Sequence, residues 1–243
     1  MELHGKVALV TGGAVRLGRA MASALAGEGM RLVVHFNSSR APADELVDEI
    51  RKAGGEAVAI GADLARGDEV ERLAREAVAA FGGVDVLVNS ASVFPPEALE
   101  ETDEALWDHT MAVNLKAPFF LIRHLAPTLR ERRGVVVNMA DLAGIQAWAR
   151  YAAHGISKAG IAHLTRVAAR ALAPEVRVVG IAPGAVLPPD DTDDAELERL
   201  ANTAALRRLG SPDDVVGALL YLLRADFVTG EILVVDGGRR LRG

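Results

Sequence analysis

Seven short apolar runs alternate along this chain with longer segments whose apolar residues recur at helical spacing. The runs read KVALVTGG, RLVVHF, EAVAIGADL, VDVLVNSAS, GVVVNMA, VRVVGIAPG and EILVVDGG. Runs that are apolar at nearly every position are typical of strands covered on both faces. Strands of this kind, separated by helices, form parallel sheets with right-handed crossovers. The pattern therefore predicts an α/β fold, with a doubly wound seven-stranded parallel sheet and helices on both faces.

Composition excludes several classes of protein. The 243 residues are 50% hydrophobic, which suffices for one full core, and no repeat or linker divides residues 1–243, so we expect a single domain. A net charge of −6 argues against a nucleic-acid partner, which would require a basic surface. The absence of cysteine excludes disulfides, thiolate metal sites and a cysteine nucleophile.

No targeting or membrane segment is expected. The N-terminal MELHGKVALVTGG lacks the charged and apolar regions of a signal peptide, and no apolar run reaches the ~18 residues of a membrane span. We therefore expect a soluble, cytoplasmic protein without a membrane partner. We also expect no metal site, because no metal-ligand spacing is found among His4, His35, His109, His124 and His163.

A glycine turn, TGGAVRLG (Thr11–Gly18), follows the first strand and opens the first helix. Backbone N–H groups at a helix N-terminus attract phosphate through the helix dipole and their unsatisfied donors. The spacing is wider than G-x-G-x-x-G, and Arg16 stands where a middle glycine is usual. The turn predicts a Rossmann fold that binds a dinucleotide; a plain strand-to-helix turn is the alternative.

The second strand ends in HFNSSR (His35–Arg40), without the acid that usually binds the ribose 2′-OH in NAD sites. Ser38, Ser39 and Arg40 offer donors, and Arg16 is expected beside the same groove. Donors and cations suit a 2′-phosphate. The segment therefore favours NADPH as cofactor, against the alternative of a polar loop with a capping serine.

These motifs occur in a specific order. After the glycine turn come Asp63-Leu64, Asn89-Ser90-Ala91, Asn114, Lys158 and Pro183-Gly184. In this order the chain resembles the short-chain dehydrogenase/reductase family from end to end. It is most similar to the pteridine reductase branch, on four features: Arg16 in the glycine turn, NSASVF (Asn89–Phe94), Asp141 at the position of the usual catalytic serine, and the C-terminal DGGRRL.

The resemblance implies a set of cofactor contacts. They are Gly12, Arg16, Leu17, Gly18, Ser38, Ser39, Arg40, Asp63, Leu64, Asn89, Ala91, Lys158, Pro183 and Gly184. Within this set Asp63 would accept from the adenine amino group. Thr11 is expected to tie strand ends together without touching a ligand.

The segment YAAHGISK (Tyr151–Lys158) departs from the family. Tyr151 and His154 precede Lys158 by seven and four residues, so all three lie on one helical face. In the family the residue four before the lysine is a tyrosine that donates the proton, the lysine binds the nicotinamide ribose, and the residue matching Asn114 keeps a water near it. Here that tyrosine is His154.

We hypothesise that His154 is the proton donor or relay, because imidazole is a common general acid at neutral pH. Lys158 and an oxidised nicotinamide would disfavour its charged form, whereas a facing Asp141 would favour it. The alternatives are weak or lost catalysis and direct donation by Asp141 or Tyr151. Tyr151 is otherwise a substrate contact or a packing residue.

The resemblance also implies a substrate pocket. Phe94 would sandwich a flat pterin against the nicotinamide, with Arg16 and Ser92 as hydrogen-bond donors and Tyr151 in contact; for Phe94, packing beside Pro95 and Pro96 is the alternative. Residues 184–206 are expected to form a loop over the substrate. Its acids are expected to mark a solvated helix start, namely Asp190, Asp191, Asp193 and Asp194.

The sequence therefore predicts an NADPH-dependent reductase of a pterin-like C=N bond, as in dihydrobiopterin or dihydrofolate, with Asp141, His154, Lys158 and Asn114 as catalytic residues. One alternative is a carbonyl reductase such as a 3-oxoacyl-[acyl-carrier-protein] reductase. Another is a catalytically weak protein that binds NADPH without turnover. Family members are commonly tetramers, so we expect a homotetramer built on the helices at 104–130 and 151–173.

Overall fold

The computed structural model describes residues 1–188 and 192–241, which form one seven-stranded parallel sheet in the order β3-β2-β1-β4-β5-β6-β7. The predicted fold class is thereby confirmed, with each apolar run of the sequence supplying one strand. The strands are β1 (Val7–Val10), β2 (Arg31–Phe36), β3 (Ala57–Gly61), β4 (Val86–Asn89), β5 (Val135–Met139), β6 (Arg177–Pro183) and β7 (Ile232–Val235).

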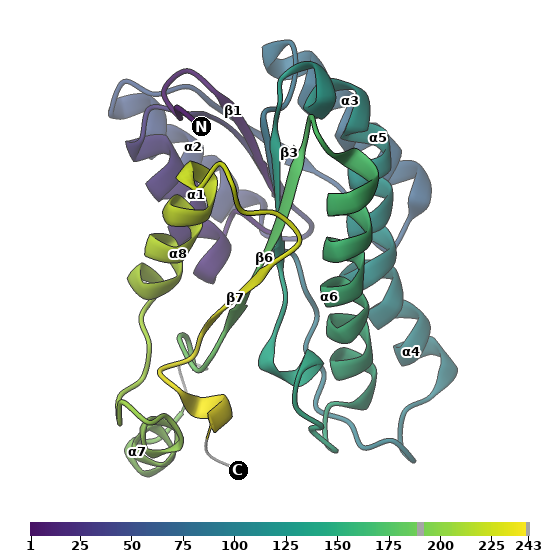
Figure 1. Cartoon of the computed structure of the whole chain (residues 1–243), viewed down its shortest axis with the longest axis vertical. Helices are drawn as coiled ribbons and strands as arrows, with labels where there is room; N and C mark the ends of the chain where they lie inside the picture. The colour runs from purple at the N-terminus through teal and green to yellow at the C-terminus, as the bar shows by residue number, and fades with distance from the viewer. Residues whose placement is uncertain (189–191, 242–243) are drawn as a thin grey trace.

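Helices cover both faces of the sheet (Figure 1). One layer holds α1 (Arg16–Gly27), α2 (Arg40–Lys52) and α8 (Pro212–Arg224); the other holds α3 (Gly67–Phe81), α5 (Ala117–Glu131) and α6 (Ala152–Leu172). Alternate strand residues face opposite layers: Ala8 and Val10 pack with α1, whereas Val7 and Leu9 pack with α3 and α5. Both faces are buried, which explains why the strands are apolar at successive positions.

The helix expected at 104–130 is divided into three parts. It consists of α4 (Glu104–Met111), a π-helical turn η1 (Ala112–Lys116) and α5. The wide turn carries Asn114, which is buried. Single π-turns inside helices frequently occur at functional sites, and periodicity alone does not reveal them.

Residues 184–206 were expected to form a loop, and this expectation is wrong in part. The segment contains α7 (Asp194–Thr203), because the Asp193 carboxylate caps the helix by accepting from the Glu196 N–H at 2.8 Å. Asp193 and Asp194 thus mark a helix start, as expected. Asp190 and Asp191 lie outside the described residues.

The parallel arrangement places the carboxyl ends of all strands at one edge of the sheet, where the segments that follow β1, β4, β5 and β6 meet. This edge is the usual ligand site of open α/β sheets. Within the described ranges, 1–188 and 192–241, no helix has the length and apolar character needed to cross a membrane.

Candidate active site

A cavity of about 620 Å³ opens at this edge. Most of the predicted site residues line it: Gly12, Arg16, Leu17, Gly18, Ser38, Ser39, Asp63, Leu64, Ala91, Ser92, Phe94, Asp141, His154, Lys158, Pro183 and Gly184. Four predicted residues are not in its lining: Arg40, Asn89, Asn114 and Tyr151. The structure therefore brings together groups from seven separate stretches of the chain, and their individual roles toward a ligand stay predictions.

The glycine turn is shaped by close backbone approaches. Gly12 has a φ of +63°, which favours glycine, and a Cβ on Gly18 would lie 2.0 Å from the Gly12 carbonyl oxygen. The Thr11 hydroxyl accepts hydrogen bonds from the N–H groups of Ser90 and Ala91, at 2.9 and 3.0 Å. The expected role of Thr11 in tying the strand ends together is thereby confirmed.

Arg16 adopts a φ of 51° and donates from its guanidinium to the Leu187 carbonyl. Its side chain therefore connects the glycine turn to the segment that follows β6, across the cavity. This bridge is an additional role, beside the ligand contacts predicted for Arg16.

His35 is a site residue that the sequence analysis missed. It is buried in β2, its Nδ1 accepts from the Gly12 N–H at 3.1 Å, and its Nε2 lies 3.0 Å from the Ala62 carbonyl. Burial lowers the pKa of His35 to about 4, although the hydrogen bond to Ala62 acts to raise it. The neutral ring therefore holds the glycine turn to β2 and β3. Its one signal in the sequence was a histidine inside an apolar strand.

The end of the cavity beyond β2 is lined by Asn37, Ser38 and Ser39, without a carboxylate from this segment. Arg40 does not line it: the side chain is exposed and its Nε lies 3.4 Å from Asp44 on the next turn of α2. At the start of α2 the guanidinium of Arg40 therefore contacts its own helix, and its contact with a cofactor stays a prediction.

Asn89 lies behind the cavity lining, and its contact with a cofactor stays a prediction. Its side chain is buried and donates to the Asn138 Oδ1 at 2.8 Å, and Asn138 donates to the Thr165 hydroxyl at 2.9 Å. This polar chain joins β4, β5 and α6 behind the cavity. The Asn89 side chain therefore holds the sheet edge together and does not line the cavity.

Asn114 lies behind His154 and organises the catalytic end. Its Nδ2 donates to the Val93 carbonyl at 3.0 Å and to the Ser157 hydroxyl at 3.1 Å, while its Oδ1 accepts from the Val93 N–H at 2.8 Å. Two of these bonds join η1 to the segment after β4, and the third joins it to α6. Asn114 therefore fixes the backbone of the segment after β4 against the helix that carries His154.

The proton arrangement of the His154 ring follows from its neighbours. The side chain is 2% exposed, and its Nδ1 lies 3.0 Å from the Val93 carbonyl and 3.4 Å from Asn114 Nδ2. Because both Nδ2 protons of Asn114 are directed to Val93 and Ser157, the Nδ1 of His154 carries a proton and donates to Val93. The other nitrogen, Nε2, faces Asp141 Oδ2 at 3.7 Å and has no hydrogen bond with the described residues.

Asp141 reaches this position through a short 3₁₀ turn, η2 (Leu142–Gly144), which it caps by accepting from the Ala143 N–H at 2.7 Å. A Cβ on Gly144 would lie 2.7 Å from the Lys158 carbonyl carbon, so the glycine lets η2 pack directly on α6. Burial raises the pKa of Asp141, but hydrogen bonding and the charges of His154 and Lys158 outweigh burial and hold the pKa below its usual value.

Lys158 is fully enclosed beside this pair. Its Nζ donates to the Met139 carbonyl at 2.8 Å, and burial lowers the pKa of the amine to about 8, against the favourable charge of Asp141. The catalytic end therefore combines a carboxylate, an imidazole and an amine within one buried network. Such a set can hold and deliver a proton in a site that excludes water.

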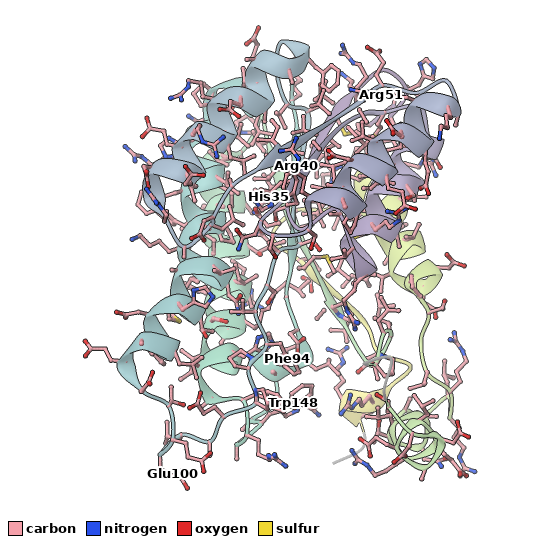
Figure 2. All side chains as sticks on the ribbon, turned by 180° about the vertical axis from the view of Figure 1, so that it is seen from behind. His35, Arg40, Arg51, Phe94, Glu100 and Trp148 are labelled. Atoms are coloured by element: carbon pink, nitrogen blue, oxygen red, sulfur yellow. The ribbon has the colours of Figure 1, made fainter. Side chains whose placement is uncertain are left out.

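Aromatic rings form the outer wall of the catalytic end. Phe94 is 48% exposed, stacks on Tyr151 with ring centroids 4.3 Å apart and an interplanar angle of 7°, and meets the His154 ring edge-on at 4.5 Å. Tyr151 is therefore a packing residue behind Phe94, not part of the cavity lining. Figure 2 shows Phe94 and Trp148 close together at this end of the molecule.

Comparison with known proteins identifies the family. A family model described as "Enoyl-(Acyl carrier protein) reductase" matches residues 13–240. The 3-oxoacyl-[acyl-carrier-protein] reductase FabG of Staphylococcus epidermidis is 36% identical over 243 residues, covering 96% of this chain and 98% of the relative. The chain belongs to the short-chain dehydrogenase/reductase family.

Solved members of the short-chain dehydrogenase/reductase family share the whole fold. FolM alternative dihydrofolate reductase 1 from Brucella canis, crystallised with NADP, has a TM-score of 0.93 at 33% identity, covering 99% of this chain and 96% of that one. A blue fluorescent protein from a metagenomic library, crystallised with NADPH, has a TM-score of 0.92 at 31% identity, covering 98% and 99%.

The cavity suits the dinucleotides that this family uses. The glycine turn, the hydroxyls of Ser38 and Ser39, and Lys158 all line it, and they would face the phosphates, the adenosine ribose and the nicotinamide end of a bound dinucleotide. His154, whose Nε2 has no hydrogen bond with the described residues, lines the same cavity as Lys158. The donor set therefore fits a bound dinucleotide.

Proposed function

We propose that the protein is an NADPH-dependent reductase of a pterin, in which His154, paired with Asp141, donates the proton. The observation that carries the proposal is the buried Nε2 of His154, which faces Asp141 Oδ2 at 3.7 Å and lines the cavity beside Phe94. With Asp141 in place of the family serine, the Asp141–His154 pair offers an imidazole N–H as donor. Such a donor suits a substrate that receives its proton on a nitrogen atom. The likeness to the Brucella FolM protein supports a pterin substrate.

NADPH is the proposed cofactor. The segment beyond β2 offers Asn37, Ser38 and Ser39 and no carboxylate that would repel a 2′-phosphate. Asp63 lines the opposite side of the nucleotide end, where it would accept from the adenine amino group. When bound, NADPH supplies the hydride, and the protein's own residues orient the substrate and move the proton.

The geometry allows His154 to work as a proton donor that is recharged after each turnover. Protonation places a second N–H on Nε2, facing the Asp141 carboxylate, while Nδ1 stays bound to Val93. After donation, the ring would take up another proton before the next turnover, and Asp141 would act as the anion that faces it at 3.7 Å.

The test is NADPH oxidation with dihydrobiopterin and dihydrofolate between pH 5 and 8, for the natural protein and for His154→Phe and His154→Tyr. We expect the natural protein to turn over, with a rate that falls as the pH rises, and the phenylalanine variant to lose at least about a hundredfold in kcat. An unchanged rate in His154→Phe would overturn the assignment of the donor. If only the His154→Tyr variant turned over, the cofactor site would be intact, but the natural protein would not reduce pterins.

A second candidate is a carbonyl reductase, which the similarity to the Staphylococcus FabG protein favours. Against it, the serine and tyrosine that hold a ketone oxygen in the family are replaced here by Asp141 and His154. A carboxylate next to the developing oxyanion of a ketone would oppose the reaction. Reduction of a 3-oxoacyl thioester faster than of either pterin would favour this alternative.

We also propose that the protein is a homotetramer. Apolar side chains are exposed on the outer faces of α5 and α6, among them Phe119, Ile156 and Val167. Exposed apolar groups on neighbouring long helices are typical of interaction sites. Sedimentation equilibrium should give four times the 25.6 kDa mass of the chain.

A further inference from the structure

Arg239 is the cationic residue of the cavity that the proposed reaction does not use. It belongs to a short 3₁₀ turn, η3 (Arg239–Leu241), that follows β7, and it lines the cavity. Its guanidinium carbon lies 5.2 Å from the centroid of the Trp148 ring. In Figure 2 the turn lies beside Trp148, at the same end of the molecule as Phe94.

The guanidinium of Arg239 has no acidic partner within the described ranges. The nearest acid in the chain, Asp236, uses both carboxylate oxygens to accept backbone N–H groups, from Gly238 and Arg240, each at 2.8 Å. Among the described residues that line the cavity, only Asp63 and Asp141 are acidic, and Asp141 faces His154. The turn therefore presents an unneutralised cation to the cavity.

Trp148 holds this cation without consuming its hydrogen-bond donors. A guanidinium placed over an aromatic face is stabilised through the ring while its N–H edge remains available for a planar anion such as a carboxylate. Asp236 in turn fixes the backbone of η3, so Arg239 is held at a defined place. His109, which also lines the cavity, adds a second basic group on α4.

A line of aromatic contacts joins the reacting end to Arg239. His154 meets Phe94, Phe94 stacks on Tyr151, and Tyr151 lies 6.2 Å from Trp148, on which Arg239 is placed. A substrate whose reducible ring lies at Phe94 would therefore extend its substituent along this wall. An anionic group at the far end of the substituent would meet the guanidinium.

We propose that Arg239, supported by Trp148, binds a carboxylate on the tail of the substrate and so selects pterins with an anionic tail, such as dihydrofolate, over those with a neutral tail, such as dihydrobiopterin. This inference rests on the proposed reduction of a pterin. A charge-assisted bidentate contact accounts for a discrimination of about tenfold or more. It does not take part in the transfer of hydride or proton.

The kinetic test compares both substrates in Arg239→Gln. The ratio of kcat/KM for dihydrofolate to that for dihydrobiopterin should fall at least about tenfold, through the KM for dihydrofolate. The matched control is Arg240→Gln: the neighbouring arginine is exposed, is not in the cavity lining, and binds Asp236 only through its backbone N–H. This control should keep the natural ratio, and a fall of equal size in both variants would overturn the inference.

A binding test separates this inference from the proposed function. Calorimetry of the NADP⁺-loaded protein with p-aminobenzoylglutamate, the tail without the reducible ring, should show binding that Arg239→Gln weakens at least about tenfold. Binding that depends on Arg239, without reduction of either pterin, would retain the anion site and reject the proposed reaction. Absence of binding by the natural protein, or equal binding by the variant, would reject the anion site even if pterins are reduced.

Discussion

The Nε2 atom of His154 lies 3.7 Å from Asp141 Oδ2. The opposite nitrogen is held by the Val93 carbonyl, so the ring cannot turn its free nitrogen away from the carboxylate without losing that bond. In the proposed reaction, the donor is therefore a pair of residues and not His154 alone.

The first prediction concerns the carboxylate that faces His154. Asp141→Asn removes the facing charge but keeps an oxygen that can cap η2 through the Ala143 N–H. Because the proposed donor would lose its anionic partner, kcat for pterin reduction should fall at least about tenfold. Steady-state NADPH oxidation by both proteins is the measurement. An unchanged kcat in the variant would contradict a role of Asp141 in proton donation.

The second prediction concerns the glycine turn. A methyl group at position 18 would lie 2.0 Å from the Gly12 carbonyl oxygen, and this contact is relieved only if the backbone moves. Gly18→Ala should therefore weaken NADPH binding at least about tenfold and lower the free energy of unfolding by about 1–3 kcal/mol. Fluorescence titration and urea denaturation measure the two effects.

Gly27→Ala is the matched control for that substitution. It lies in the same helix, α1, and its Cβ would meet nothing within 4 Å. Alanine in a helix is more favourable than glycine by about 0.5–1 kcal/mol, so this variant should bind NADPH normally and be slightly more stable. A similar loss of affinity in both variants would show that the turn is not the cause.

The third prediction concerns the choice between dinucleotides. Ser38→Asp places a carboxylate at the cavity end beyond β2, where it repels a 2′-phosphate and accepts from a 2′-OH. The ratio of kcat/KM for NADPH to that for NADH should fall at least about tenfold. Arg40→Gln serves as the control, because Arg40 pairs with Asp44 outside the cavity. A larger effect of Arg40→Gln than of Ser38→Asp would show that Arg40, and not Ser38, decides between the two dinucleotides.

The sequence predicted the fold well because buried parallel strands leave a continuous apolar signature. Each strand is covered on both faces, so Val7 and Ala8, which face opposite layers, are both apolar. The break of the helix after β4 into α4, η1 and α5 was not predictable in this way. A π-turn adds one residue to a helical turn without changing the composition of the segment. Here the turn carries Asn114, whose side chain donates to the Val93 carbonyl.

Site residues that directly follow the end of a strand could be predicted from the sequence. Residues whose contacts depend on the direction of the side chain could not. His154 and Asp141 face each other as the resemblance implied. Arg40 and Tyr151 occupy the expected places in the chain, but Arg40 pairs with its own helix and Tyr151 stacks on Phe94. Arg239 was not predicted as a site residue, because the sequence alone does not show that the turn after β7 lies beside the cavity.

The last prediction concerns acid stability and rests on His35. Its pKa in the folded protein is lowered by burial to about 4, below the usual value of 6.5, so the folded state disfavours the charged ring. The stability that the neutral ring contributes is fully present above pH 6.5 and is lost as the pH falls toward 4. A shift of this size corresponds to about 3 kcal/mol. His35→Gln, which cannot titrate, should lose less stability over this range.

Urea denaturation at half-unit steps between pH 4 and 7.5 measures this difference. The control is His163→Gln, because His163 is exposed on α6 and its removal should leave the natural pH dependence in place. His35 also accepts from the Gly12 N–H, so protonation removes a bond that holds the glycine turn. NADPH affinity should therefore decline with stability in the natural protein, and a decline of the same steepness in His35→Gln would show that another group is responsible.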